Sequence, residues 1–404
     1  MNRLHQKCLV CAAGVLIAAL ALFTALLPKK EFSENENRYL ASFPELSAES
    51  VRNAEFMSGI ETYVSDHFVL RDLFMTVRTC YERITGRNQV NGVYICEDGY
   101  CIEEYRESKN RERIKKAVLR LCEGVESADI RICLVPTAVS VYSDRLPSAS
   151  RNADQLRDMK EMIDEIKTGL MNTTGKESGS GANEDASDNN GSGNGSAGGR
   201  IQFTDVTDTL KAHADENIFY RLDHHWTTLG AYYAYVELCS DLGIEPYKRS
   251  DYEERTVSTT FKGSFYSKIN DLTMKPDTIT AFESNRMDLT VRYPDKKLET
   301  DTLTAEEYLN KKDQYSYFLN NQNSFIEIHN KNADTDRVLA VVKDSYANCL
   351  VPFLAEHFET VYVFDTRYYR DRVTAFINGN GVTDVLFLYN MYTIDTDTGI
   401  AGIY

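Results

Sequence analysis

The C-terminal part of the chain alternates short apolar runs with helical patterns. Strand-like runs at residues 337–342, 360–365 and 384–390 are separated by helical patterns at 346–358 and 372–379. Near-continuous apolar strands separated by helices are typical of a parallel sheet that is buried on both faces. The sequence therefore predicts an α/β, doubly wound architecture.

The alternation extends towards the N-terminus. A helical pattern at 110–125 precedes a strand-like run at 129–136, and another strand-like run follows at 201–206. Between them, residues 172–200 consist mainly of Gly, Ser, Asn and Asp, a composition that cannot anchor a packed core. We expect a disordered insertion within one domain, because long surface insertions raise the closure entropy only slowly.

The N-terminal segment is a candidate membrane anchor. Residues 8–27 carry no charge, and at roughly 1.5 Å per residue they span about 30 Å, one bilayer core. Arg3 and Lys7 precede this run and favour a cytoplasmic N-terminus. The sequence thus predicts a cytoplasmic stub and anchor over residues 1–30 and an extracytoplasmic domain over 31–404, in a single-pass protein of the cell membrane.

A cleaved signal peptide is the alternative reading of the same segment. Ala19-Leu20-Ala21 resembles a small-residue cleavage site. The apolar run continues beyond that site, which favours a retained anchor.

The charge balance excludes one class of partner. The formal net charge is −16, which opposes polyanion binding over the whole surface, so we expect no nucleic-acid partner.

Cys96 and Cys101 flank a Gly-containing turn within residues 91–105, a pattern typical of a β-hairpin. In an oxidising compartment these cysteines could form a cross-hairpin disulfide, or they could stay as two free thiols. The sequence leaves both readings open.

Ser345 follows the strand-like run 337–342 and precedes a helical pattern. In parallel α/β sheets, functional groups gather where strands end and helices begin. A serine at such a turn can present its hydroxyl at the sheet edge, beside backbone N–H groups that await an oxyanion. A serine that only caps its helix would give the same pattern.

A second candidate lies in Asp223-His224-His225-Trp226-Thr227, just before a helical pattern at 227–242. A nucleophilic serine needs a base to accept its proton and a carboxylate to orient that base. In an extended stretch residues i and i+2 project to one side, so Asp223 and His225 suit these two roles. Asp223, His224 and His225 could instead ligate a metal, but the other histidines form no companion ligand motif, and we expect neither metal nor cofactor.

Together these residues resemble a known family. The run from Tyr220 to Thr227 (YRLDHHWT) is similar to the signature of the DHHW protein family of Gram-positive bacteria. That family resembles the AlgX/AlgJ-type alginate O-acetylation proteins of the SGNH hydrolase superfamily, which carry Asp-x-His-Trp and a later Asp-Ser, here Asp344-Ser345. Further matching stretches are SENENR (33–38), NGVY (91–94), VPT (135–137) and YSDRLP (142–147).

The resemblance implies an SGNH-like three-layer fold with a mainly parallel sheet and a Ser-His-Asp acyl-transfer mechanism. His225 would deprotonate Ser345, and Asp223 would orient His225. Two features depart from the superfamily: Lys343 stands where Gly-Asp-Ser has its glycine, and the triad order is Asp, His, Ser. The alginate group shares that order.

Four further residues are candidates for oxyanion or substrate binding. The resemblance implies that Asn390 donates its side-chain amide to the oxyanion; an ordinary turn residue is the alternative. Gly263 offers a second N–H or simply a glycine turn. Arg367 and Tyr389 follow strands, and similar residues line the site in the alginate proteins, which implies substrate contact.

The expected function is that of an extracytoplasmic O-acetyltransferase or acetylesterase acting on cell-envelope or exported polysaccharide. The resemblance implies a membrane-bound O-acyltransferase partner that delivers the acyl group. A non-catalytic glycan-binding or assembly protein that keeps the fold is the alternative, with Lys343 as its best argument.

Overall fold

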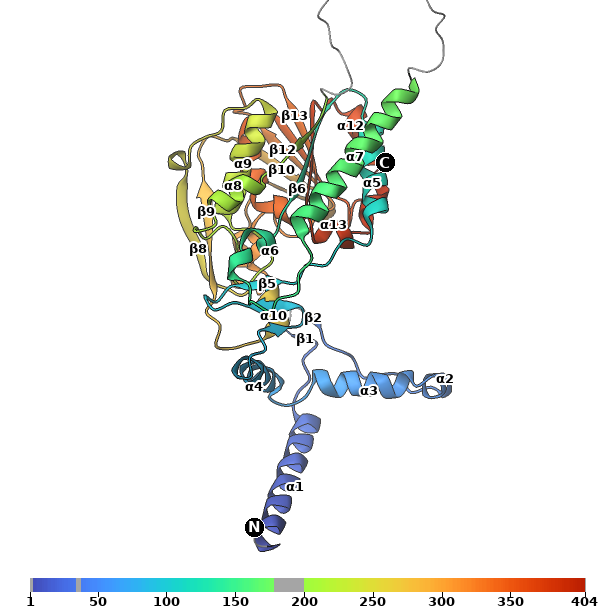
Figure 1. Cartoon of the computed structure of the whole chain (residues 1–404), viewed down its shortest axis with the longest axis vertical. Coiled ribbons are helices and arrows are strands. Elements are labelled where there is room, and N and C mark those ends of the chain that lie inside the picture. The colour runs from blue at the N-terminus through green and yellow to red at the C-terminus, as the bar shows by residue number, and fades with distance from the viewer. Residues whose placement is uncertain (1–2, 34–37, 178–199, 404) are drawn as a thin grey trace, which may run out of the picture. The chain divides into compact units, whose positions relative to one another are not determined.

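The structure, a computed structural model, describes residues 3–33, 38–177 and 200–403 (Figure 1). The described chain forms two compact units: Met1–Val93 with Ser264–Lys275, and Tyr94–Gly263 with Pro276–Tyr404. The predicted domain 31–404 therefore spans parts of both units. Of the expected insertion, residues 178–199 lie outside the described residues, whereas 172–177 continue a helix.

The second unit is built on an eight-stranded mixed sheet. Five strands run parallel in the order β14-β13-β15-β6-β7, and β12, β10 and β11 continue the sheet antiparallel from β14. The α/β prediction with a mainly parallel sheet is confirmed. From edge to edge the strands are β11 (Leu298–Thr300), β10 (Leu289–Tyr293), β12 (Phe325–Asn330), β14 (Thr360–Asp365), β13 (Val338–Lys343), β15 (Asp384–Asn390), β6 (Asp129–Val135) and β7 (Ile201–Thr204).

Helices cover both faces of this sheet (Figure 1), which gives the three layers. One layer holds α8 (Thr207–Ala212), α9 (Thr228–Leu242), the 3₁₀ helix η6 (Ser345–Cys349) and α11 (Val351–Leu354). The other holds α5 (Arg111–Gly124), α7 (Gln155–Glu177), α12 (Val373–Gly379) and α13 (Thr393–Thr396). The unit also contains α6 (Ala138–Val141), the strand β5 (Cys101–Glu103) and the antiparallel pair β8 (Glu253–Phe261) and β9 (Asp277–Glu283).

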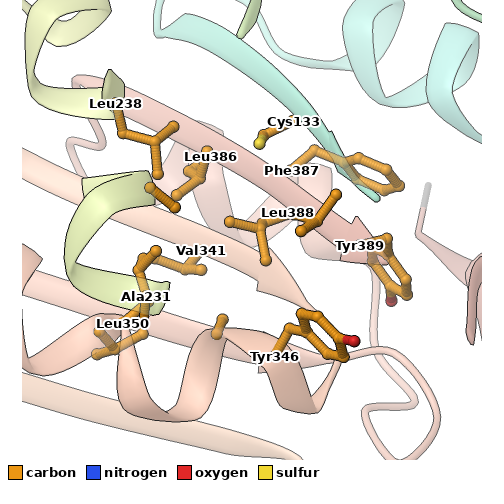
Figure 2. Packing of buried hydrophobic residues seen from close by; sticks show 14 of the residues in the cluster. Cys133, Ala231, Leu238, Val341, Tyr346, Leu350, Leu386, Phe387, Leu388 and Tyr389 are labelled. Atoms are coloured by element: carbon orange, nitrogen blue, oxygen red, sulfur yellow. The ribbon is translucent and has the colours of Figure 1, made fainter. Parts of the chain in front are cut away.

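The centre of the core shows why these apolar runs form a sheet. Successive side chains of β15 point to opposite faces, so Leu386 and Leu388 pack beneath α9 while Phe387 and Tyr389 stack on the other side, with ring centroids 4.8 Å apart (Figure 2). All four are fully buried. A strand that is apolar on both faces must be covered twice, as a sheet between two helix layers is.

The predicted hairpin is present, with β4 (Val93–Ile95) and β5 on either side of a turn in which the Cys96 N–H donates to the Tyr100 carbonyl at 2.8 Å. Cys96 and Cys101 are both buried, and no disulfide joins them. Burial raises the pKa of Cys96 to about 12.

The first unit is mainly helical. It comprises α1 (Arg3–Leu26), β1 (Phe32–Ser33), β2 (Arg38–Tyr39), α2 (Ala48–Arg52), α3 (Glu55–Asp66), α4 (Arg71–Ile84), β3 (Gln89–Val90) and, from the later segment, α10 (Ser264–Ile269). Within the described residues one helix, Lys7–Leu26, is long and apolar enough to cross a membrane; its mean hydropathy is 2.6 and none of it is buried.

Candidate active site

The Asp223–His225 segment is a tight loop rather than the extended stretch that the sequence suggested. Backbone bridges close it: the Tyr220 N–H donates to the His225 carbonyl at 3.2 Å, and the Thr227 N–H donates to the Ile218 carbonyl at 2.9 Å. Within the loop, Asp223 Oδ1 accepts the His225 N–H at 3.0 Å, which is an Asx turn. The turn brings Asp223 Oδ1 within 2.5 Å of His225 Nδ1.

Ser345 stands at the carboxyl end of β13, as the first residue of η6. Asp344 caps η6 and accepts the Tyr346 N–H at 2.9 Å. Ser345 is partly exposed, whereas Tyr346 and Ala347 are fully buried. The turn thus leaves the Ser345 hydroxyl partly exposed while the residues that follow it are packed in the core.

The three predicted triad residues meet in one hydrogen-bonded line. His225 Nε2 lies 2.8 Å from Ser345 Oγ, and His225 Nδ1 lies on Asp223. His225 and Asp223 are buried, with 6% and 5% of their surface exposed. With a carboxylate on Nδ1, the proton of a neutral imidazole lies on Nδ1, which leaves Nε2 free to accept from the serine hydroxyl.

Two aromatic residues, Tyr315 and Trp226, connect the Asp223–His225 loop with the turn that carries Ser345. The ring of Tyr315 stacks on His225 with centroids 3.7 Å apart at 10°, and its hydroxyl donates to the Ser345 carbonyl at 3.0 Å. Trp226 Nε1 donates to the Tyr346 carbonyl at 2.8 Å. Tyr315 therefore contacts both His225 and Ser345, and Trp226 joins the loop to Tyr346, so the loop and the serine turn share their packing. Tyr315 lies in a stretch without a local motif, so no sequence pattern marks it as part of the site.

Asp344 is a buried structural carboxylate beneath Ser345. It has no exposed surface, and burial raises its pKa to about 7. Its Oδ2 accepts two bonds from Asn390, one from the backbone N–H at 2.8 Å and one from the side-chain amide at 2.6 Å. These bonds hold the carboxyl ends of β13 and β15 together under Ser345.

That arrangement corrects the role expected of Asn390. Its amide nitrogen has two hydrogens, and they are directed at Asp344 and at Thr393 Oγ1, the latter at 2.7 Å. Its amide oxygen accepts the N–H groups of Tyr392 and Thr393. No amide hydrogen remains for an oxyanion, and the side chain is 1% exposed.

Tyr389 lies in the core, with no exposed surface. It is fully buried on the α5 side of the sheet, and its hydroxyl bonds with Thr366 Oγ1 at 2.6 Å and Asp397 Oδ2 at 3.1 Å. The side chain is core, because alternation along β15 sends residue 389 to the face opposite α9.

Lys343 has defined partners where the superfamily has glycine. Its side chain is buried, with Nζ 2.7 Å from Asn348 Oδ1 and 3.4 Å from Asp365 Oδ2. Arg367 closes the cluster, since two of its guanidinium nitrogens donate to Asp365 at 2.8 and 2.6 Å. Burial raises the pKa of Asp365, but the charges of Lys343 and Arg367 outweigh it and hold the pKa below its ordinary value.

The same cluster orients Asn348. An ammonium only donates, so the amide oxygen of Asn348 must face Lys343 and the amide NH₂ must face away. In a 3₁₀ helix the side chains at i and i+3 eclipse, so Asn348 lies on the same side of η6 as Ser345. Asn348 was not among the residues predicted from the sequence, and its spacing of three residues from Ser345 is the signal that could have identified it.

Gly263 lies against the carboxylate of the triad. A Cβ added to this glycine would stand 2.5 Å from Asp223 Cγ and closer still to Oδ2. The absence of a side chain is therefore what lets the two segments approach.

Substituting that glycine tests the contact. Gly263→Ala should lower the rate of the acyl transfer that the sequence predicts about 10²-fold, because the displaced carboxylate misplaces His225 by a fraction of an ångström or more. Gly379→Ala is the matched control, since a Cβ at Gly379 meets nothing within 4 Å. The measurement is kcat for ester hydrolysis in both variants; equal rates would show that Asp223 does not depend on this approach.

The same residues are poorly arranged to bind a metal ion, because His225 already has partners on both ring nitrogens. Single ligand atoms of Asp223, His224 and His225 lie within 4.8 Å of one another. Both ring nitrogens of His225 already have partners, Asp223 and Ser345. A metal on His225 would have to displace one of them, so the arrangement fits a proton relay better.

Comparisons with known proteins agree with the fold. The model of the DHHW protein family matches residues 36–108 and 199–364, more than half of the chain. No curated protein matches the sequence. The solved structure of a DHHW family protein from Eubacterium siraeum is 26% identical, with a TM-score of 0.61, and the match covers 77% of this chain and 95% of that one.

A more distant structure, that of PatB1, shares the fold. Bacillus cereus PatB1 with a sulfonyl adduct is 16% identical at a TM-score of 0.54, over 75% of this chain and 95% of that one. The O-acetyltransferase domain of Pseudomonas putida AlgJ matches at 14% identity over 75% of this chain and 92% of that one, but its TM-score of 0.43 is too low to support a conclusion. The family match is the firm result: the chain belongs to the DHHW protein family.

Proposed function

We propose that this protein is a membrane-anchored serine O-acetyltransferase or acetylesterase that acts outside the cytoplasm on polysaccharide. The observation that carries the proposal is the line Asp223–His225–Ser345, with contacts of 2.5 and 2.8 Å and a partly exposed hydroxyl at its end. The PatB1 structure, which shares the fold, carries a sulfonyl adduct, and sulfonyl groups are reagents for activated serine hydroxyls.

The geometry suggests the following reaction. Ser345 Oγ attacks the acetyl carbonyl while its proton passes to His225 Nε2, and Asp223 stabilises the resulting imidazolium. When the tetrahedral intermediate collapses, the leaving alcohol takes the proton from His225, and the acetyl group stays on Ser345. A sugar hydroxyl or water then attacks the acetyl carbon and gives its proton to His225, which passes it to Ser345 Oγ as the bond between the acetyl group and the serine breaks.

Two donors are available for the oxyanion. The Ser345 N–H donates no hydrogen bond within the described residues, and it lies at the start of η6, where helix N–H groups are free. The Asn348 amide has no acceptor within the described part of the chain and shares the Ser345 side of η6. We assign these two groups, rather than Asn390, to the oxyanion, and Gly263 to the support of Asp223.

The oxyanion assignment predicts a large kinetic effect. Asn348→Ala should lower kcat about 10²–10³-fold with little change in KM, since the donor acts mainly on the transition state. Asn332→Ala serves as control, because the Asn332 amide donates to the Arg286 carbonyl at 3.1 Å and, within the described residues, has no contact with Ser345 or Lys343. If Asn348→Ala changes KM and leaves kcat as it was, Asn348 contacts substrate instead.

The apolar helix α1 supports the proposed location. Anchoring by Lys7–Leu26 would keep the catalytic unit beside the membrane, where a membrane-bound O-acyltransferase partner could hand over the acetyl group. Arg367 remains a candidate for substrate contact, because it is part-exposed at the same edge of the sheet as Ser345.

The function as a whole is tested with acetyl esters. Purified protein should hydrolyse p-nitrophenyl acetate and should move acetyl groups to or from a polysaccharide, followed by release or uptake of acetate. Glycan binding without turnover, and without labelling by a serine-directed probe, would favour the non-catalytic alternative.

A further inference from the structure

The helix α4 in the first unit has its apolar side facing outwards. Six apolar side chains at its start and along it are 47–85% exposed: Leu70, Leu73, Phe74, Val77, Tyr81 and Ile84. At 100° per residue these positions fall within an arc of about 100°, one continuous stripe along the helix. We call this set the α4 stripe.

The polar side of α4 is the side that is buried. Thr76 and Thr79 are 7% and 1% exposed, and their hydroxyls donate to the carbonyls of Asn270 and Ile269, both at 3.2 Å. Asp72 accepts the Asn270 amide at 3.0 Å. A helix in a water-soluble domain buries its apolar side, so this inverted arrangement indicates that the α4 stripe meets an apolar environment outside the first unit.

The chain itself shows where that environment lies. The Val69 N–H donates to Thr24 Oγ1 at 3.1 Å, and Thr24 lies in the last turn of α1. The apolar segment Lys7–Leu26 ends two residues later. If α1 spans the bilayer, α4 therefore begins at the level where the hydrocarbon core meets the headgroups.

We propose that α4 lies in the outer membrane–water interface, with the α4 stripe in contact with lipid. This inference rests on the proposed anchoring by α1 but not on the acyl-transfer chemistry. Leu, Phe, Val, Ile and Tyr are the residues that an interfacial helix inserts. Arg78, at the edge of the stripe with 64% of its side chain exposed, can extend its charge to the headgroups.

The contact is driven by apolar area rather than by charge. The chain carries a net charge of −16, which would repel anionic lipid. We therefore expect the α4 stripe to stay on zwitterionic vesicles at high salt, unlike a contact made by basic residues.

The test places a tryptophan reporter in the full chain, reconstituted in phosphatidylcholine vesicles. The only native tryptophan, Trp226, is fully buried, so its signal is a constant background. Phe74→Trp and Ile84→Trp lie at two ends of the stripe, and Arg83→Trp on the flank towards Asp271 is the matched control. Quenching is measured with lipids that carry a nitroxide at a shallow position of the acyl chain.

Both stripe reporters should be quenched severalfold more strongly than the control, at low and at high salt. Equal quenching at all three positions, or none at Phe74→Trp and Ile84→Trp, would overturn the proposal. An alkaline wash distinguishes anchoring by α1 from the interfacial position of α4. If the chain stays in the vesicles after the wash while the stripe reporters are unquenched, α1 is an anchor but α4 does not lie in the interface. Release of the chain by that wash would refute the anchor, and with it this inference, whatever the esterase activity.

Discussion

Replacing Ser345 by alanine should abolish turnover of p-nitrophenyl acetate. The hydroxyl 2.8 Å from His225 Nε2 is the group that would form the acyl-enzyme, and its loss leaves only catalysis by binding and oxyanion donors. We expect kcat to fall about 10⁴–10⁶-fold, the range seen when a triad nucleophile is removed.

Ser345→Ala also has a built-in control for folding. The Tyr315 hydroxyl bonds to the backbone carbonyl of residue 345 and Asp344 caps η6, so neither interaction needs the serine side chain. The thermal unfolding midpoint should therefore stay close to that of the original protein. An inactive variant that is also unfolded would say nothing about chemistry, whereas a folded and fully active one would contradict the triad.

Replacing Asp223 by asparagine should have the second-largest effect. The asparagine amide can still fill the space of the carboxylate. Because the amide is neutral, it no longer holds a proton on His225 Nδ1 and no longer stabilises the imidazolium. A drop of about 10⁴-fold in kcat is the expected size for this change in a triad.

The matched variant for Asp223→Asn is Asp344→Asn. Both aspartates are buried, but Asp344 accepts backbone and amide N–H groups and does not contact His225. The Asp344 change should mainly lower the free energy of unfolding, by about 1–3 kcal/mol, because an amide NH₂ would meet donors there. If Asp223→Asn lowers stability and leaves kcat unchanged, Asp223 is structural and the orienting role fails.

Local sequence patterns predicted which three side chains, those of Asp223, His225 and Ser345, come together in the site. The strand run before Ser345 and the Asp-x-His spacing both come from short segments, and the structure brings the three side chains within hydrogen-bond reach. The reason for the Asp223–His225 contact differed, since an Asx turn and not an extended stretch joins them. Their catalytic role stays a prediction.

The supporting residues could not be read from the sequence. Asn390 follows a strand as an oxyanion donor would, but its amide hydrogens go to Asp344 and Thr393, a choice decided by partners that lie far along the chain or in the next turn. Tyr315 reaches His225 from a region without a motif. No sequence pattern around Gly263 predicts that this glycine approaches Asp223.

The first unit shows a different limit. The sequence pattern predicts helix over about residues 49–85, and α4 (Arg71–Ile84) lies within that range. The usual rule then places the apolar side in the core, whereas Thr76 and Thr79 are buried instead. Their partners at Ile269 and Asn270 lie about 190 residues away, so only the tertiary structure reveals which side faces out.

The most direct test of the central claim is to find where a sulfonyl fluoride attaches. The protein is incubated with phenylmethylsulfonyl fluoride, digested, and the modified residue is located by peptide mass spectrometry, with His225→Ala treated in parallel. We predict one adduct, on Ser345, and a large loss of labelling in His225→Ala, because the imidazole 2.8 Å away is what activates the hydroxyl. An adduct on another residue, or labelling of Ser345 that proceeds equally without His225, would contradict the account.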